Sequence, residues 1–477
     1  MNDLHFQGLS WISEQIKRRT ISPVEVTRHL LERVSEYDRT LSSYVTITAD
    51  RALQQASRAE QEIARGFSRG PLHGVPIAAK DLLFTKDIVT TAGTSLFKDH
   101  VPSFNATVID RLEQAGVVLL GKLKTTEGAL FSYHKRVIPP RNPWNEQYSP
   151  GVSSGGSAVA TAAGLCFGSL GTDTGGSIRL PSACCGLTGL KPTWGRVSRH
   201  GLFPLADSLD HIGPIARSAS DAATILAAIA GADRNDPTAL DADVPDYLAR
   251  MRQNIRSVRI GVDHTFNTSD VSEEVAAALT QAENGFAERG AKICRVTIPK
   301  TEKVIPAFLT LCSVEGAFAH KDTYPLHAAE YGSELSALIE EGRKTTALQV
   351  EESLQERRRF SGLMFSLFKE VDLLLTPTIS VTVPRLDSID FEQMTIENSI
   401  DGGNTIAPLY STLLRFTAPF NFSGNPAISF PAGFSSSGLP IGLQLVGRHL
   451  SEDLVCRAVH AFQQETDWHN HHPKIAV

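Results

Sequence analysis

Short apolar strands alternate with helical segments along residues 72–232, and this alternation limits the folds open to the chain. In chain order the expected elements are strand 75–79, helix 107–115, strand 117–120, helix 158–163 and strand 167–170. Strands that alternate with helices in this way are typical of an α/β core. Apolar strands return at 371–375, 427–430 and 441–446, and we expect them to join the same core.

The first 65 residues have a different pattern, which predicts a helical N-terminal layer. Residues 22–25, SPVE, fit a capping box with proline at the first helical position. Val26, Leu30 and Val34 then recur every four residues, which predicts one buried helix face.

Composition argues against several classes of protein. Lys and Arg number 46 against 52 Asp and Glu, and the net charge of −6 offers no general surface for nucleic-acid phosphates. The longest apolar stretch, 223–232, is too short to cross a bilayer, and the N-terminus lacks the pattern of a secretory signal. Six Cys without metal-ligand spacing predict neither a disulfide framework nor structural zinc. We therefore expect a soluble cytoplasmic protein without a metal.

Two loops rich in Gly and Ser, GVSSGGS and GTDTGGS, lie within residues 149–186 on either side of one helix–strand unit. Glycines beside a serine let backbone N–H groups approach a reacting atom closely, as an oxyanion hole requires. Ordinary loops also use Gly and Ser, so one such loop alone would indicate little. Two of them around a single unit favour a catalytic site.

Three other catalytic motifs do not explain these loops. Residues 151–155, GVSSG, fit the nucleophile elbow G-x-S-x-G, but the preceding NPWNEQYSP cannot be the buried strand that the elbow needs. Residues 132–135, SYHK, fit the Ser-x-x-Lys of penicillin-recognising enzymes, yet no Lys-Thr-Gly follows. No Walker phosphate motif is present.

The base for a serine nucleophile is either a histidine or a lysine. His469, His471 and His472 lie in a polar tail, which favours a solvated chain end over a metal site. Lys80 ends the apolar strand 75–79, where burial would favour its neutral form. The alternative is that Lys80 lies at a strand end with its alkyl chain buried and its charged amino group exposed at the surface.

Longer matches point to one family. They are HGVPIAAKD (73–81), SSGGS (153–157), GTDTGGSIR (171–179), GLKPTWGRVS (189–198) and PIGLQ (440–444). In these segments the chain resembles the amidase signature family, over residues 70–470 and least within 240–370. The resemblance implies a mixed central β-sheet covered by α-helices on both faces. We expect a helical layer at 1–65 and a core at 66–477, with 240–370 as a more variable, mostly helical insertion.

The resemblance also implies a Ser–cis-Ser–Lys triad. Ser177 would be the nucleophile, Lys80 the base and Ser153 the serine between them, with a cis peptide bond before Ser153. Val152 departs from the glycine that many family members carry here, and a β-branched residue narrows the conformations of the loop. The implied oxyanion hole consists of the backbone N–H groups of Thr174, Gly175, Gly176 and Ser177.

Five further residues are candidates for contacts around the triad. Ser154 would either donate to the proton relay or cap the next helix, and we favour the cap. Asp173 resembles a supporting carboxylate of the family, although a turn-forming role would also explain it. Arg179 would bind a substrate carboxylate or, as we favour, pair with an acidic neighbour. Phe131 and Tyr133 are expected to line an apolar pocket. Other apolar candidates for this pocket are Phe318, Leu374, Phe416 and Phe420.

The expected function is hydrolysis of a carboxamide C–N bond, or of a related anilide, ester or carbamate, through an acyl-enzyme. The alternative is the A-type glutaminase component of a tRNA-dependent amidotransferase, which shares these motifs and works only with partner subunits. A non-catalytic binding protein on the same scaffold is the third hypothesis. We expect a small-molecule amide and water as reactants, no cofactor, no nucleic-acid or membrane partner, and a homodimer.

Overall fold

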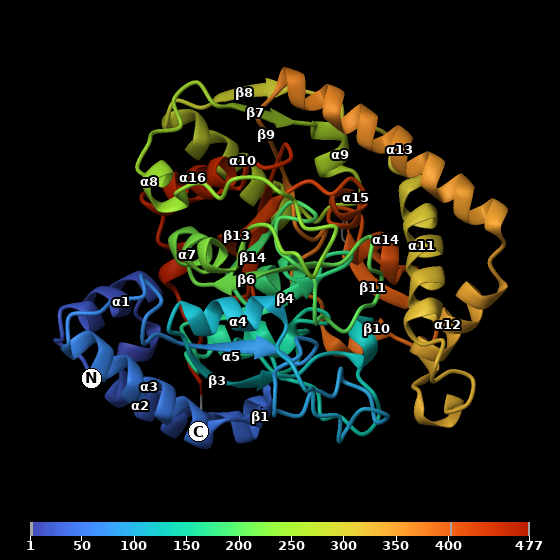
Figure 1. The fold of residues 1–477 in the computed structure, drawn as a ribbon. Coiled ribbons are helices and arrows are strands. Elements are labelled where there is room, and N and C mark those ends of the chain that lie inside the picture. The colour runs from blue at the N-terminus through green and yellow to red at the C-terminus, as the bar shows by residue number, and fades with distance from the viewer. Residues whose placement is uncertain (1–2, 401–402, 476–477) are drawn as a thin grey trace.

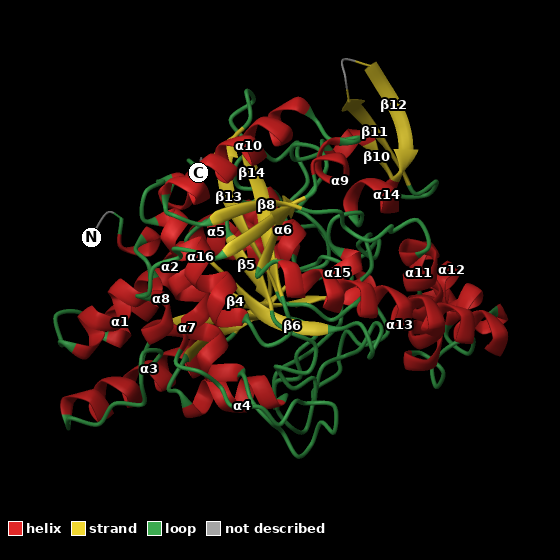
Figure 2. Ribbon diagram, turned by 90° about the horizontal axis from the view of Figure 1, so that it is seen from above, coloured by secondary structure: helices red, strands yellow, loops and turns green. Residues whose placement is uncertain are grey.

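A large mixed sheet runs through the molecule, and helices flank it on both faces (Figures 1 and 2). The computed structural model describes residues 3–400 and 403–475. The strands of the sheet are β1 (Tyr44–Ile47), β2 (Pro76–Lys80), β3 (Val118–Leu123), β4 (Gly168–Asp173), β5 (Thr188–Lys191), β6 (His211–Ala216), β7 (Arg259–Val262), β8 (Lys292–Arg295), β9 (Leu373–Pro377), β13 (Ala427–Phe434) and β14 (Pro440–Gly447). Their order in the described residues is β1-β3-β2-β4-β6-β5-β13-β14-β9-β7-β8. The expected α/β fold is confirmed.

Helices of very different lengths surround this sheet. They are α1 (Leu9–Lys17), α2 (Pro23–Leu41), α3 (Ala49–Ala64), α4 (Thr107–Gln114), α5 (Gly155–Ala162), α6 (Arg179–Cys184), α7 (Ala219–Ile229), α8 (Tyr247–Met251), α9 (His264–Thr268), α10 (Glu273–Glu288), α11 (Val304–Ala319), α12 (Ser333–Lys344), α13 (Ala347–Glu370), α14 (Leu409–Leu413), α15 (Ala418–Phe422) and α16 (Glu452–Gln463). A separate small sheet of β10 (Ile389–Asp390), β11 (Thr395–Ile400) and β12 (Gly403–Pro408) projects from the body (Figure 2).

The N-terminal segment begins as its sequence predicts. The Ser22 hydroxyl accepts hydrogen bonds from the N–H groups of Val24 and Glu25, and the Glu25 carboxylate closes the capping box. Val26 and Leu30 are completely buried. The segment is not purely helical, because β1 pairs antiparallel with β3 and extends the sheet at this edge.

The site depends on the central strands β2 and β4, which are parallel neighbours with Ala78 opposite Ser169. β2 ends at Lys80 as predicted, whereas β4 runs further than its apolar residues predict, to Asp173. In β4 the polar end continues as a strand because it pairs antiparallel with β6, where Asp173 lies opposite His211. The carboxyl ends of β2 and β4 therefore lie side by side, which brings Lys80 close to the second Gly/Ser loop.

Residues 240–370 are mostly helical, and they also supply two strands. β7 pairs parallel with β9 and with β8, so the segment completes one edge of the large sheet. α11, α12 and α13 pack together on one side of the molecule (Figure 1). The division into a layer at 1–65 and a core at 66–477 stays a prediction. Among the described helices, none is both long and apolar enough to cross a membrane.

Candidate active site

Lys80 is completely buried, with its amino group surrounded by hydroxyls. Its Nζ lies within hydrogen-bond distance of three side-chain oxygens, 2.7 Å from Ser153 Oγ, 2.8 Å from Thr172 Oγ1 and 3.0 Å from Ser154 Oγ. Burial lowers the pKa of Lys80 well below its ordinary value, against the weaker opposing effect of Asp210. The structure therefore excludes the surface-lysine interpretation and favours a neutral amine.

A second buried lysine shows what is unusual about the first. Lys122 is as buried as Lys80, but its Nζ lies 3.1 Å from the carboxylate of Asp81. No carboxylate lies within ion-pair distance of Lys80 in the described part of the chain. A buried ammonium without a counter-charge is costly, so Lys80 is arranged to hold a lone pair rather than a charge.

Ser153 and Ser154 lie in the turn before α5. Ser154 occupies the N-cap position of α5 but makes no side-chain capping bond. Its hydroxyl instead bonds the N–H and the C=O of Thr172 in β4, so the favoured capping role is wrong. The peptide bond before Ser153 is trans, since Tyr324–Pro325 is the one cis bond within residues 3–400 and 403–475. The expected cis bond is thus absent here, and trans is the form that a non-proline bond favours by about 3–4 kcal/mol.

Ser177 follows β4 in the second Gly/Ser loop and is 8% exposed. Its hydroxyl makes no hydrogen bond with any residue the structure describes, Ser153 included. The backbone N–H groups of residues 174–177 likewise have no hydrogen-bond acceptor in the described chain. Four unpaired donors beside a free hydroxyl are what an oxyanion hole and its nucleophile require.

Glycines make the close approach in this loop possible. A Cβ on Gly175 would lie 2.9 Å from the ring of Phe308, and one on Gly176 would lie 2.6 Å from Thr417 Oγ1. Gly176 also has a positive φ of 151°, a conformation that L side chains rarely adopt. The loop geometry at Ser177 therefore depends on both glycines.

Asp173 and Arg179 form a completely buried ion pair below this loop. Arg179 donates through Nε and Nη2 to the carboxylate, and also to Asn421 and Gln444. Burial by itself raises the pKa of Asp173, but the charge and hydrogen bonds of Arg179 outweigh this and hold it below its ordinary range. Because the N–H donors of Arg179 already bind Asp173, Asn421 and Gln444, its contacts support the favoured interpretation as a structural partner of an acidic neighbour. Asp173 also accepts from the N–H of Ile178, next to Ser177.

We expect Asp173→Asn to lower the free energy of unfolding by about 3–5 kcal/mol, because it leaves the Arg179 charge buried without its partner. Urea unfolding followed by circular dichroism measures this change. The matched control is Asp207→Asn, which breaks a 3.4 Å pair with Arg199 on a carboxylate that is 71% exposed. That change should cost no more than about 1 kcal/mol. Equal losses in the two variants would contradict a structural role for the buried pair.

A small cavity of about 40 Å³ lies directly beside Ser177. Its lining is almost entirely apolar and includes Phe131, as expected. Tyr133 does not line this cavity; its hydroxyl faces Gly155 at the start of α5. Phe318 is exposed, and the other expected pocket residues, Leu374, Phe416 and Phe420, are buried outside this lining.

From the sequence we expected parts of 310–420 to line the pocket, but most of the individual residues of the cavity wall were not named. They are Ala129, Leu130, Val152, Leu205, Phe308, Leu309, Cys312, Leu338, Tyr410 and Leu414. Thr172, which binds Lys80, was also missed, although it precedes Asp173 in the same motif. Several wall residues come from α11, α12 and α14, where apolar side chains look like ordinary core in the sequence. Thr172 could have been found, since alternate residues of a strand share one face.

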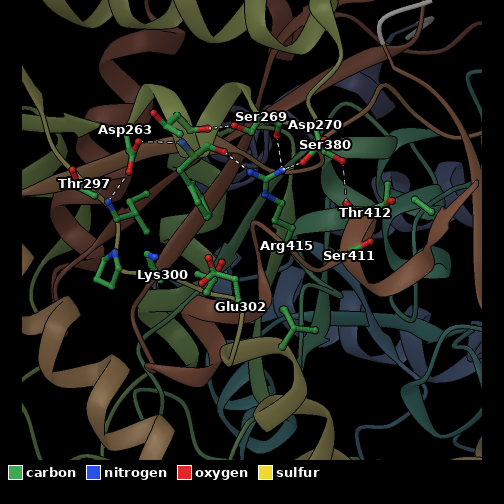
Figure 3. A pocket seen from close by; sticks show the side chains of 17 residues that line it. Asp263, Ser269, Asp270, Thr297, Lys300, Glu302, Ser380, Ser411, Thr412 and Arg415 are labelled. Carbon is green, nitrogen blue, oxygen red and sulfur yellow. Dashed lines mark hydrogen bonds and ion pairs between the residues drawn. The ribbon is translucent and has the colours of Figure 1, made fainter. Parts of the chain in front are cut away.

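A much larger cavity lies elsewhere. It has a volume of about 800 Å³ and is lined from α9, α14 and the segment 297–302. Figure 3 shows Arg415 in this cavity, bonded to the backbone of Ser269 and near Asp270. Lys80, Ser153 and Ser177 are not among its lining residues. In the described residues no group of three His, Cys, Asp or Glu is placed to hold a metal ion.

Comparisons with known proteins show the family to which the chain is similar. A family model described as Amidase matches residues 25–456. "Putative amidase AmiD" of Mycobacterium tuberculosis is 44% identical over 467 residues, which cover 98% of this chain and 96% of AmiD. The A-type component of the glutamyl-tRNA(Gln) amidotransferase of Moorella thermoacetica is 36% identical over 502 residues and is matched along 100% of both chains. The solved structure of 6-aminohexanoate cyclic dimer hydrolase superposes with a TM-score of 0.88 at 26% identity, covering 99% of each chain.

Proposed function

The chain belongs to the amidase family, and on that premise we propose that Ser177 attacks the carbonyl carbon of a carboxamide, with Lys80 as base and Ser153 between them. The enzyme is an amide hydrolase acting on C–N bonds other than peptide bonds. The observation that carries the assignment of residues is the burial of Lys80 among three hydroxyls without a carboxylate.

The reaction begins with proton transfer. Neutral Lys80 takes a proton from Ser153, which takes one from Ser177 as Ser177 Oγ attacks the carbonyl carbon. For this the Ser177 hydroxyl turns toward Ser153, and it is free to do so because it has no other hydrogen-bond partner in the described chain. The N–H groups of residues 174–177 stabilise the negative oxygen of the tetrahedral intermediate.

Collapse of the intermediate breaks the C–N bond. The proton held by Lys80 returns through Ser153 to the nitrogen, so that the amine leaves neutral and Ser177 keeps the acyl group. Water then attacks the acyl-enzyme while Lys80 again accepts a proton through Ser153. The second intermediate collapses as that proton returns through Ser153 to Ser177 Oγ, which restores the serine hydroxyl and the neutral lysine and releases the carboxylic acid. Atoms and charges balance without a metal or cofactor.

The A-type component of an amidotransferase is the competing proposal, because one such protein is 36% identical to this chain along its whole length. The 44% identity to AmiD and the valine at position 152 support the stand-alone enzyme. We expect the purified single chain to hydrolyse members of a panel of aryl and alkyl amides. The amidotransferase component would be favoured instead if glutamine were the one substrate hydrolysed and if its hydrolysis required added partner proteins.

Two broader properties of the enzyme are also part of this proposal. From the family resemblance over residues 70–470, we expect this chain to form a homodimer. We also expect the enzyme to be cytoplasmic. A non-catalytic binding protein is the least supported hypothesis, because Lys80, Ser153 and Ser177 are all present. Covalent labelling of Ser177 by a fluorophosphonate would separate an enzyme from such a protein.

A further inference from the structure

A second cavity lies next to the one at Ser177 and is far larger. It has a volume of about 580 Å³, against about 40 Å³ for the cavity at the nucleophile. Roughly 10–15 Å³ holds one water-sized group, so the inner cavity takes about three such groups. We call the two spaces the inner and the outer cavity.

Four residues line both cavities, so the cavities adjoin at these side chains, which we call the partition. These are Leu130, Leu309, Leu338 and Tyr410. Leu338 comes from α12, Leu309 from α11 and Tyr410 from α14. The partition thus combines the neighbouring helices α11 and α12, which pack against each other (Figure 1), with α14 from further along the sequence.

The structure holds α12 firmly at this wall. The Glu334 carboxylate accepts hydrogen bonds from the N–H groups of Phe131 and Ser132, and Glu127 accepts one from Gly332. Further along the helix, a Cβ on Gly316 of α11 would lie 2.6 Å from a methyl carbon of Leu338. The absence of a side chain at Gly316 lets α11 and α12 pack closely, and it places Leu338 as a fixed part of the wall.

We propose that Leu338 determines which amides this enzyme accepts, by limiting the apolar group beside the scissile bond to the short length that the inner cavity holds. The inference rests on the proposed function, since it needs Ser177 to be the nucleophile. In this arrangement an acyl or amine group of up to about three carbons fits. A longer group meets the partition, and kcat/KM falls.

The test compares wild type with Leu338→Ala on two series of substrates. One series is acyl p-nitroanilides from acetyl to octanoyl, and the other is N-alkyl acetamides from methyl to octyl. In wild type we expect kcat/KM to fall at least about 10-fold between two and six carbons in one series. Leu338→Ala should remove that fall, and the series that responds identifies whether the acyl or the amine group occupies the inner cavity.

The matched control is Leu335→Ala on the same helix. Leu335 is buried against Gly128 and lines neither cavity, so its loss removes core packing without opening the partition. Both variants should have lowered melting temperatures. Only Leu338→Ala should change the ratio of long-chain to short-chain kcat/KM.

The charges of the outer cavity provide a second readout. Its ionisable lining residues include Glu334, Glu341 and Glu392, and among the described residues no Lys, Arg or His lines it. In Leu338→Ala, an acyl chain that ends in a carboxylate should therefore react more slowly than its methyl ester. Adding Glu341→Gln should reduce this difference. A helix that had merely become loose would not discriminate by charge.

Several results would overturn the inference. One is a wild type that accepts six carbons as readily as two in both series, and another is an unchanged ratio in Leu338→Ala. Equal changes in Leu335→Ala would also contradict it. These outcomes are separable from failure of the proposed function, because that failure would appear as retained activity in Ser177→Ala.

Discussion

Replacement of Ser177 by alanine should lower kcat by a factor of about 10⁴ or more, because no acyl-enzyme can form without its hydroxyl. The remaining rate would come from the N–H groups of residues 174–177 and from substrate binding. Stability should change little, within about 0.5 kcal/mol, because the Ser177 hydroxyl has no hydrogen-bond partner in the described chain to lose. Steady-state kinetics on a hydrolysed amide, together with urea unfolding, measure both effects.

A neighbouring serine provides the control for this change. Ser182 is completely buried in α6, and its hydroxyl donates to the Ile178 carbonyl at 2.8 Å. Ser182→Ala should lose about 1 kcal/mol of stability while keeping its activity. Ser177→Ala should thus lose activity and keep its stability, whereas Ser182→Ala should lose stability and keep its activity. A Ser177→Ala enzyme with wild-type kcat would rule out Ser177 as the nucleophile.

Replacement of Lys80 by methionine should reduce kcat by about 10³-fold or more, since the relay then lacks its base. In wild type the active form is the neutral amine. Activity should therefore be present above the lowered pKa of Lys80 and be lost as the pH falls through it. The measurement is the pH profile of kcat/KM for wild type, beside the residual rate of Lys80→Met.

The same pKa shift makes a prediction about stability. The folded state holds Lys80 neutral, while the unfolded chain protonates it up to its ordinary pKa of 10.5. Between the lowered pKa and about 10.5 the unfolded state binds more protons, so wild-type stability should rise with pH in that window. Lys80→Met should remove the contribution of Lys80 to this rise of stability with pH. The variant should gain most stability over wild type at the lower end of the pH window.

Lys122→Met is the matched control, because Lys122 is equally buried but paired with Asp81. Its removal leaves a buried carboxylate without a partner and should cost about 3–5 kcal/mol. Activity per folded molecule should be kept. If both lysine variants were destabilised alike at neutral pH, Lys80 would be a charged structural residue and not a neutral base.

Local pattern predicted the elements near the site and the order in which they occur. The capping box at Ser22 and the strand that ends at Lys80 both follow from side chains close together in the sequence. The end of β4 did not follow, because residues 171–173 resemble a turn until β6 pairs with them. The two strands within 240–370 were missed for the same reason, since β7 pairs with β9, more than a hundred residues further along the chain, and β8 joins the sheet only through β7.

In the site, the catalytic roles of Lys80, Ser153 and Ser177 stay predictions, and several expectations about their surroundings were wrong. Ser154 was expected to cap α5, but its hydroxyl binds β4 because that strand passes beside the turn. Tyr133 was expected in the pocket and lies outside it, whereas Phe308 and Tyr410 line it. An apolar residue in a sequence does not show whether its neighbour in space is core or a cavity.

The sequence by itself determined the candidate reacting groups of this protein: a lysine at the end of a buried strand and two serines in glycine-rich loops. These are matters of residue type and short spacing, which motifs record directly. Only the tertiary structure decided the surroundings of Lys80 and the size of the space beside Ser177. Both depend on what lies around an atom, namely the hydroxyls packed against one amine and the helices α11, α12 and α14 that meet at one wall. Such surroundings arise only when distant segments pack together.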